Sequence, residues 1–184
     1  MISTLATLRE GCEPWEVASA LNGLGLLAHW AGDRRAARGY LTDALSLFQQ
    51  CGDTHRAASA MAMLGTLLDA DGEPERAAEL VAEALRLGPA LDELRATVSC
   101  IRAAMQISSE HAPAEMLARL LGALDVLFAR LSFPLSPRQQ ASHAKYVAAV
   151  RAALGEEAFA AAWADGRALT LEESVTEALA ALQR

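Results

Sequence analysis

The stretch "ALNGLGLLAHWAGDRRAARGYLTDALSLF" (20–48) aligns with "AMAMLGTLLDADGEPERAAELVAEALRLG" (60–88) at an offset of forty residues. Four features recur at that offset: Leu24-Gly25 with Leu64-Gly65, Gly32-Asp33 with Gly72-Glu73, Ala37 with Ala77, and Ala44-Leu45 with Ala84-Leu85. Internal repetition on this scale is typical of proteins built from stacked, similar units. The alignment therefore predicts two copies of one structural unit, over about 16–50 and 56–90.

The spacing within each unit predicts a pair of antiparallel helices. A glycine in the first helix (Gly25, Gly65) lets a neighbouring helix approach closely, and a small Ala faces it from the second helix. The Gly-acid pair between them ends the first helix. Because each pair buries its apolar side only against its neighbours, we expect an all-α stack.

A third copy keeps the step of forty but has lost its glycine. Met105 takes the glycine position, "HAPAE" (111–115) takes the turn, and Leu117 and Leu124 take packing positions in the second helix. Proline suits the first turn of a helix, where a missing N–H is tolerated. We therefore expect helices at about 91–109 and 113–131 and a third repeat over 94–131.

The last third of the chain predicts a helical cap over 137–184, which completes a single domain of residues 1–184. Ser136 followed by Pro137 and Gln139 is an N-terminal capping pattern, so a helix is expected from there to Leu154, before Gly155. A short helix over 156–164 should end at Asp165-Gly166. Thr170 with Glu173 three residues later should start the last helix.

Composition excludes several classes of protein. The net charge of -7 offers no basic surface for nucleic acid, and no apolar run is long enough to span a membrane. The N-terminus lacks the apolar stretch of a secretory signal, so we expect a cytoplasmic protein. Cys12, Cys51 and Cys100 form no Cys-x-x-Cys pair, so we expect reduced thiols packed as small hydrophobic groups, and neither a metal nor another cofactor.

The repeat resembles the tetratricopeptide repeat. Leu-Gly, Gly-Asp, Ala and Ala-Leu occur in that order, and Pro89 lies near the end of the second unit. The usual unit has about 34 residues, so the units here are longer, and Leu21 and Met61 stand where the family carries an early Trp. The resemblance implies a right-handed α-solenoid of about three helical hairpins.

The C-terminal third is similar to the end of the tetratricopeptide region in large bacterial regulators. These are STAND-type ATPase regulators, including transcriptional regulators of the LuxR and AfsR/SARP types. The matching elements are "ARLLGA" (118–123), the Pro-x-x-Pro turn (134–137) and "ALGEEAFAAAWADGRALTLEES" (153–174). The chain carries no phosphate-binding Gly-x-x-x-x-Gly-Lys loop and no basic recognition helix, so ATP and DNA binding do not carry over. We expect either the repeat region of such a regulator or a stand-alone protein.

One side of the first helices should line the concave face of the stack. A mixed polar and aromatic strip of this kind suits a peptide, a partner helix or a small effector. The alternative is that these side chains only meet solvent or the next repeat. The candidate strip consists of Asn22, Leu26, His29, Trp30, Thr66, Asp69, Arg102 and Gln106.

Catalytic and metal sites are not favoured. The four histidines have no metal-binding spacing, and no serine lies in a nucleophile elbow. His29 and Asp69 could meet across neighbouring helices, but lining the groove is the simpler interpretation. Glu156, Glu157, Glu172 and Glu173 lie in first helical turns, where they complement the helix dipole.

Phe159 and Trp163 lie one helical turn apart and favour a hydrophobic cap on the last repeat. An interface with another domain or a second copy is the alternative. The sequence thus predicts a non-catalytic interaction or sensing module with a protein, peptide or small-effector ligand. The second hypothesis is a stand-alone scaffold that assembles other proteins, with a homodimer formed through its ends.

Overall fold

The computed structural model describes residues 13–87, 94–131 and 136–183. These ranges contain nine α-helices and one 3-10 turn but no strand, which confirms the all-α solenoid. Predictions for Cys12, Pro89 and the first half of the Pro-x-x-Pro turn (134–137) lie outside the described residues. The helices are α2 (Pro14–Ala31), α3 (Arg34–Gln50), α4 (Thr54–Ala70), α5 (Pro74–Leu87), α6 (Leu94–Ile107), α7 (Ala114–Arg130), α8 (Pro137–Leu154), α9 (Glu156–Ala168) and α10 (Leu171–Ala181), with the 3-10 turn η2 (Ser108–Glu110) after α6.

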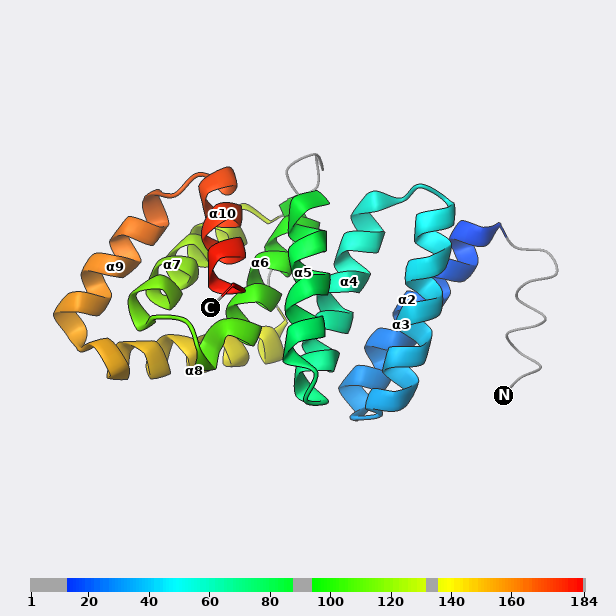
Figure 1. The fold of residues 1–184 in the computed structure, drawn as a ribbon, viewed down its shortest axis with the longest axis horizontal. Coiled ribbons are helices and arrows are strands. Elements are labelled where there is room, and N and C mark those ends of the chain that lie inside the picture. Colours follow the sequence, from blue (N-terminus) through cyan, green and yellow to red (C-terminus); the bar gives the residue numbers. More distant parts are fainter. Residues whose placement is uncertain (1–12, 88–93, 132–135, 184) are drawn as a thin grey trace.

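The helices follow one another along the long axis of the molecule. Figure 1 shows α2 and α3 at one end, α4 and α5 in the middle, and α9 at the opposite end. Helix α8 runs across the direction of the stacked helices and packs on α7 and α9. Helix α10 turns back onto α6 and α7.

The turns within the first two hairpins follow from their sequence. Gly32 and Gly72 both adopt φ of 82°, a left-handed conformation that glycine reaches without steric strain. The next residue of the first turn, Asp33, caps α3 by accepting a hydrogen bond of 2.9 Å from the backbone N–H of Ala36. The predicted Gly-acid breaks are therefore helix ends.

The small residues at the centre of each hairpin allow close packing, as predicted. A Cβ added to Gly25 would lie 2.6 Å from Cγ of Leu41, and one added to Gly65 would overlap Val81. Ala37 is fully buried on the facing helix of the first hairpin. Side chains larger than hydrogen at the two glycines would push the paired helices apart.

The third pair differs from the first two. Met105 is 1 % exposed at the predicted glycine position, and α6 packs less extensively on α7 than the helices of the earlier hairpins pack on each other. Helix α7 packs most extensively with α9 instead. A Cβ on Gly122 of α7 would overlap the carbonyl oxygen of Trp163, so the backbones of α7 and α9 approach closely there.

The prediction that Asp165-Gly166 ends a short helix is wrong. Helix α9 continues through this pair to Ala168. Gly166 is buried inside the helix, and a Cβ there would lie 2.6 Å from Cα of Arg119 and overlap its carbonyl oxygen. The glycine is needed for helix packing rather than for a turn.

The predicted caps of the C-terminal region are confirmed. Ser136 and Gln139 form a capping box at the start of α8, and Gly155 follows its end with φ of 77°. Thr170 and Glu173 form another capping box at the start of α10. In each box the hydroxyl oxygen accepts a hydrogen bond from the backbone N–H three residues on.

The cysteine prediction is half right. Cys100 is a buried free thiol whose Sγ lies 3.6 Å from the carbonyl oxygen of Ala58. Burial raises the pKa of this thiol to about 12, so it stays neutral. Cys51 is a free but exposed thiol at the end of α3, so it is not packed as a small hydrophobic group.

Candidate functional site

The candidate strip lies on α2, α4 and α6. Trp30 is 51 % exposed, and the other seven residues are half-buried. The Thr66 hydroxyl donates to the carbonyl oxygen of Met63 at 2.8 Å, so its proton is already used within the helix. Trp30 therefore offers the strip's largest accessible apolar surface.

Two further exposed apolar residues of α2 were missed by the sequence analysis. Leu24 is 37 % and Leu27 is 58 % exposed. At 100° per residue, both point away from the side of α2 that carries Asn22, Leu26 and His29. The sequence could have indicated this exposure. Helix α2 is apolar around most of its circumference, and no earlier repeat was predicted to cover it.

Trp15 is also exposed, at 42 %, but it has a clear structural role. Its indole Nε1 donates to Oδ2 of Asp53 at 2.9 Å. The Arg56 guanidinium lies 4.7 Å from the centre of its ring. These contacts tie the start of α2 to the start of α4.

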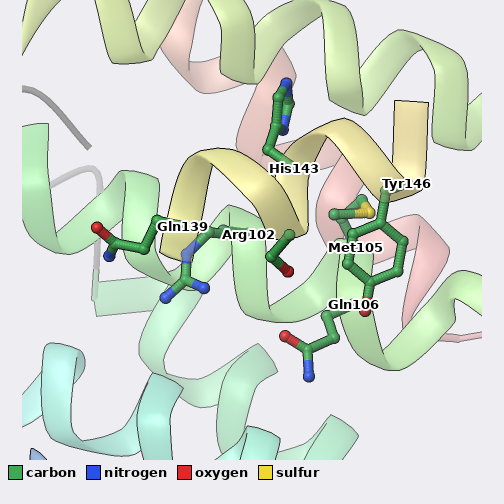
Figure 2. A pocket seen from close by; sticks show the side chains of 7 residues that line it. Arg102, Met105, Gln106, Gln139, His143 and Tyr146 are labelled. Atoms are coloured by element: carbon green, nitrogen blue, oxygen red, sulfur yellow. The ribbon is translucent and has the colours of Figure 1, made fainter. Parts of the chain in front are cut away.

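Helix α8 covers the part of the strip on α6. Arg102, Met105 and Gln106 of α6 line a small pocket together with α8 residues, and the space left is about 10 Å³, close to that of one water molecule. Figure 2 shows the yellow α8 lying against these side chains. The open part of the strip is therefore on α2 and α4. The α8 residues of the pocket are Gln139, Ser142, His143 and Tyr146.

His29 lies in a positive field. Burial lowers its pKa, and the charges of Arg138, Arg102 and Arg34 lower it further, in that order. Arg138, on α8, also places Nη1 3.5 Å from the carbonyl oxygen of Trp30. The start of α8 thus faces the end of α2.

Asp69 lies in a negative field. Burial raises its pKa, the charge of Glu110 raises it further, and His111 acts in the opposite direction. None of the charges that act on His29 comes from Asp69, and none that acts on Asp69 comes from His29. The structure therefore does not bring these two residues together as a charged pair.

Phe159 and Trp163 lie on α9, facing the rest of the chain. Phe159 is 2 % exposed and belongs to the main core, and the half-buried Trp163 packs against that core. Their ring centres are 5.3 Å apart, and the Arg151 guanidinium lies 4.6 Å from the centre of the Phe159 ring. Phe159 is thus already covered within this chain.

Metal-binding clusters and membrane-spanning helices are both absent from the described residues. No group of three or more His, Cys, Asp or Glu side chains in these ranges could hold a metal ion. None of the described helices combines the length and the apolar character needed to cross a membrane.

Comparison with known proteins identifies the first two hairpins. Residues 16–90 match the model of the tetratricopeptide repeat family, within the limits expected for the first and second repeats. No curated protein and no solved structure matches the chain. Residues 16–90 therefore form a tetratricopeptide-like region, a kind of region that generally mediates contacts between proteins, within a longer all-α solenoid.

Proposed function

We propose that this protein is a non-catalytic interaction module that binds a segment of a partner protein along α2 and α4. The observation that carries the proposal is Trp30, which is 51 % exposed beside the half-buried His29 and Leu26. Tryptophan is enriched among the residues that dominate binding energy at protein interfaces. An exposed Trp at the edge of a polar strip is therefore suited to anchor a partner.

The rest of the architecture supports a docking surface of limited length. Since α8 lies over Arg102 and Gln106, a partner segment has access to two of the three first helices. At the other end, the buried Phe159 and half-buried Trp163 are suited to cap the solenoid. One domain with three repeats and this cap, over 1–184, is part of the proposal.

The biological setting that we propose is a cytoplasmic bacterial signalling or transcriptional regulator. Support comes from the similarity of 118–179 to the end of the repeat region in STAND-type regulators. A bound segment or small effector would bias how the helix pairs sit on one another and so pass a signal to an attached domain.

The test is a thermal-shift screen of peptides and metabolites, followed by affinity measurements on variants. Trp30→Ala should weaken binding of the peptide hits by about tenfold or more, because truncation at an interface anchor typically removes 2 kcal/mol or more. Leu24→Ala is the matched control, since it removes an exposed apolar side chain that lies about 120° around the same helix from Trp30. Equal affinities of wild type and Trp30→Ala would show that the docking surface is elsewhere.

A stand-alone scaffold that dimerises through its ends is the second candidate. The exposure of Leu24 and Leu27 at the α2 end of the solenoid favours it. Size-exclusion chromatography with light scattering distinguishes the two. A dimer that Leu27→Asp converts to a monomer supports the scaffold, whereas a monomeric wild type at all concentrations excludes it.

A further inference from the structure

A stripe of apolar side chains on α2 is not covered by the described part of the chain. Leu24 is 37 % exposed, Leu27 is 58 % exposed, and Ala20 is exposed one turn before Leu24. These three residues lie at i, i+4 and i+7, so they follow one line along the helix and are called the α2 stripe below. An uncovered apolar line of this kind marks a surface on which another element packs.

The same three side chains are buried in the second repeat. Helix α4 begins forty residues after α2, so the positions of the α2 stripe are occupied there by Ala60, Leu64 and Leu67. Each of these is at most 5 % exposed. Since the residue types are identical in the two repeats, the repeats differ in what covers the stripe and not in the stripe itself.

Helix α3 covers the two leucines of α4. It packs on α4, and its Ala37 and Leu41 share one buried cluster with Leu64 and Leu67. Gly52 then follows the end of α3 with φ of 70°, and the chain turns into α4. The segment that this kind of stripe accepts is therefore an amphipathic helix that precedes it in the chain and ends at a glycine.

Residues 1–10 repeat the end of α3 in sequence. At the same offset of forty, "MISTLATLRE" (1–10) aligns with "LTDALSLFQQ" (41–50). Three large apolar residues at i, i+4 and i+7, the spacing of one helical face, coincide in the two segments. The pairs are Met1 with Leu41, Leu5 with Leu45, and Leu8 with Phe48.

The connection into α2 also resembles the connection from α3 into α4. Glu13 is the N-cap residue of α2, forty residues before Asp53, the N-cap residue of α4. Gly11 lies one residue before the position that corresponds to Gly52. An apolar helical pattern, a glycine and a capping residue thus precede α2 in the same order as they precede α4.

We propose that residues 1–10 dock as a helix on the α2 stripe, in the way that the end of α3 docks on α4. Met1 then lies against Leu24 and Leu27, since Leu41 shares a cluster with the equivalent leucines of α4. Burial of these side chains stabilises the docked helix, because a helix of this length is marginal by itself in water. The proposal goes beyond the interaction role, because it assigns an occupant within the chain to this end of the solenoid.

The docked segment leaves the proposed partner site open. Ala70 of α4 is the equivalent of Trp30, and it is exposed although α3 packs on α4. Trp30 therefore stays accessible when the α2 stripe is covered. Since the two surfaces are separate, failure of either proposal leaves the other standing.

The test is hydrogen exchange, followed by mass spectrometry, on the full chain and its variants. Leu24→Asp places a charge in the α2 stripe, at a position whose exposure allows the rest of the chain to fold as in the wild type. Ala161→Asp is the matched control, because it adds the same charge at an exposed position of α9, at the opposite end of the molecule. Exchange in α4 and α5 is recorded to show that each variant is folded.

The backbone amides of residues 4–10 should exchange about tenfold or more slowly in the wild type than in a free peptide of residues 1–12, because docking must open before they exchange. Ala161→Asp should retain this protection, and Leu24→Asp should lose it. Exchange in the wild type as fast as in the peptide would overturn the proposal. Equal protection in the wild type and Leu24→Asp would place the segment elsewhere and overturn it as well.

A change within the segment tests the same contact from the other side. Leu8→Asp leaves α2 unaltered, so this arm remains valid if Leu24→Asp disturbs that helix. Releasing the segment should speed the exchange of α2 amides over residues 20–27. Unchanged exchange there would contradict docking on the α2 stripe.

A second copy of the chain is the other possible occupant of the α2 stripe. Exchange is therefore measured at several protein concentrations, with light scattering on the same samples. Protection of residues 4–10 that is independent of concentration in a monomer supports the internal segment. Protection that increases as a dimer forms assigns the stripe to a second copy and overturns the proposal.

Discussion

Gly166→Ala should destabilise the protein, because the added methyl group meets backbone atoms that cannot move aside. The new Cβ would lie 2.6 Å from both the Cα and the carbonyl carbon of Arg119 and overlap that residue's carbonyl oxygen. Ordinary contacts of this kind begin near 3.4 Å. Helix α9 must therefore shift away from α7, which disturbs the packing of Phe159 and Ala162.

The size of the effect follows from two opposing contributions. Overpacking of this kind typically costs about 1–3 kcal/mol. Replacing a helical glycine by alanine returns up to about 1 kcal/mol in helix propensity, and less near the end of a helix. Because Gly166 lies close to the end of α9, the gain is about 0.5 kcal/mol, and we expect a net loss of about 0.5–2.5 kcal/mol. In a protein of this size, each kcal/mol lowers the midpoint of thermal unfolding by roughly 2–4 °C.

Gly39→Ala is the matched control. Gly39 lies inside α3, and a Cβ added there would have no atom within 4 Å, so the propensity gain stands alone. This variant should be more stable than the wild type by about 0.4–1 kcal/mol. Both are measured by circular dichroism during heating and in urea. A Gly166→Ala variant that melts at or above the wild-type temperature would refute the close approach of α7 and α9.

The remaining predictions concern thiols, a helix cap and pH. In a Cys12→Ser background, a thiol reagent should modify the exposed Cys51 rapidly. Cys100 should react only on unfolding, because its thiol is buried and has a pKa of about 12. Equal reaction rates for the two thiols would contradict this prediction. Asp53→Ala should reduce stability in urea by about 0.5–2 kcal/mol, because the side chain accepts from the backbone N–H of Arg56 at 3.0 Å at the start of α4; an unchanged urea midpoint would show that this cap is dispensable. Burial lowers the pKa of His143 below 6.5, so the unfolded chain takes up this proton first as the pH falls. The urea midpoint of the wild type should therefore decrease as the pH drops below about 6.5, and that of His143→Gln should decrease less over the same pH range. An equal decrease in both proteins would rule out this contribution of His143.

The fold was largely predictable because each helix of the first two hairpins carries its own local signals. Gly32 and Gly72 mark the turns, and Gly25 and Gly65 mark the helix contacts. The Asp165-Gly166 pair was misinterpreted because a Gly after an acid can end a helix or pack inside one. Only the neighbouring α7 backbone, which is remote in sequence, distinguishes the two.

The candidate site was less predictable, because its shape depends on how a non-repeat helix docks. Arg102 and Gln106 were correctly assigned to a first helix, yet they line a pocket beneath α8. Val150 is the one buried residue of α8. The sequence of this helix therefore contains little that specifies which other helices it packs against. The positive field at His29 likewise comes partly from Arg138, more than one hundred positions along the chain.

The pairing of α7 with α9 links the covered strip to the glycine contact at the far end of the molecule. The Leu-Gly pair that marks a first helix at Gly25 and Gly65 occurs again as Leu121-Gly122 in α7, and at each of these glycines another helix comes too close for a side chain. For Gly122 that helix is α9, with α8 inserted between the two helices in the sequence. Because α7 and α9 pack directly on each other, α8 cannot lie between them and must leave the stack. It lies instead over the side chains of α6, so the pairing of α7 with α9 also determines where the strip is closed.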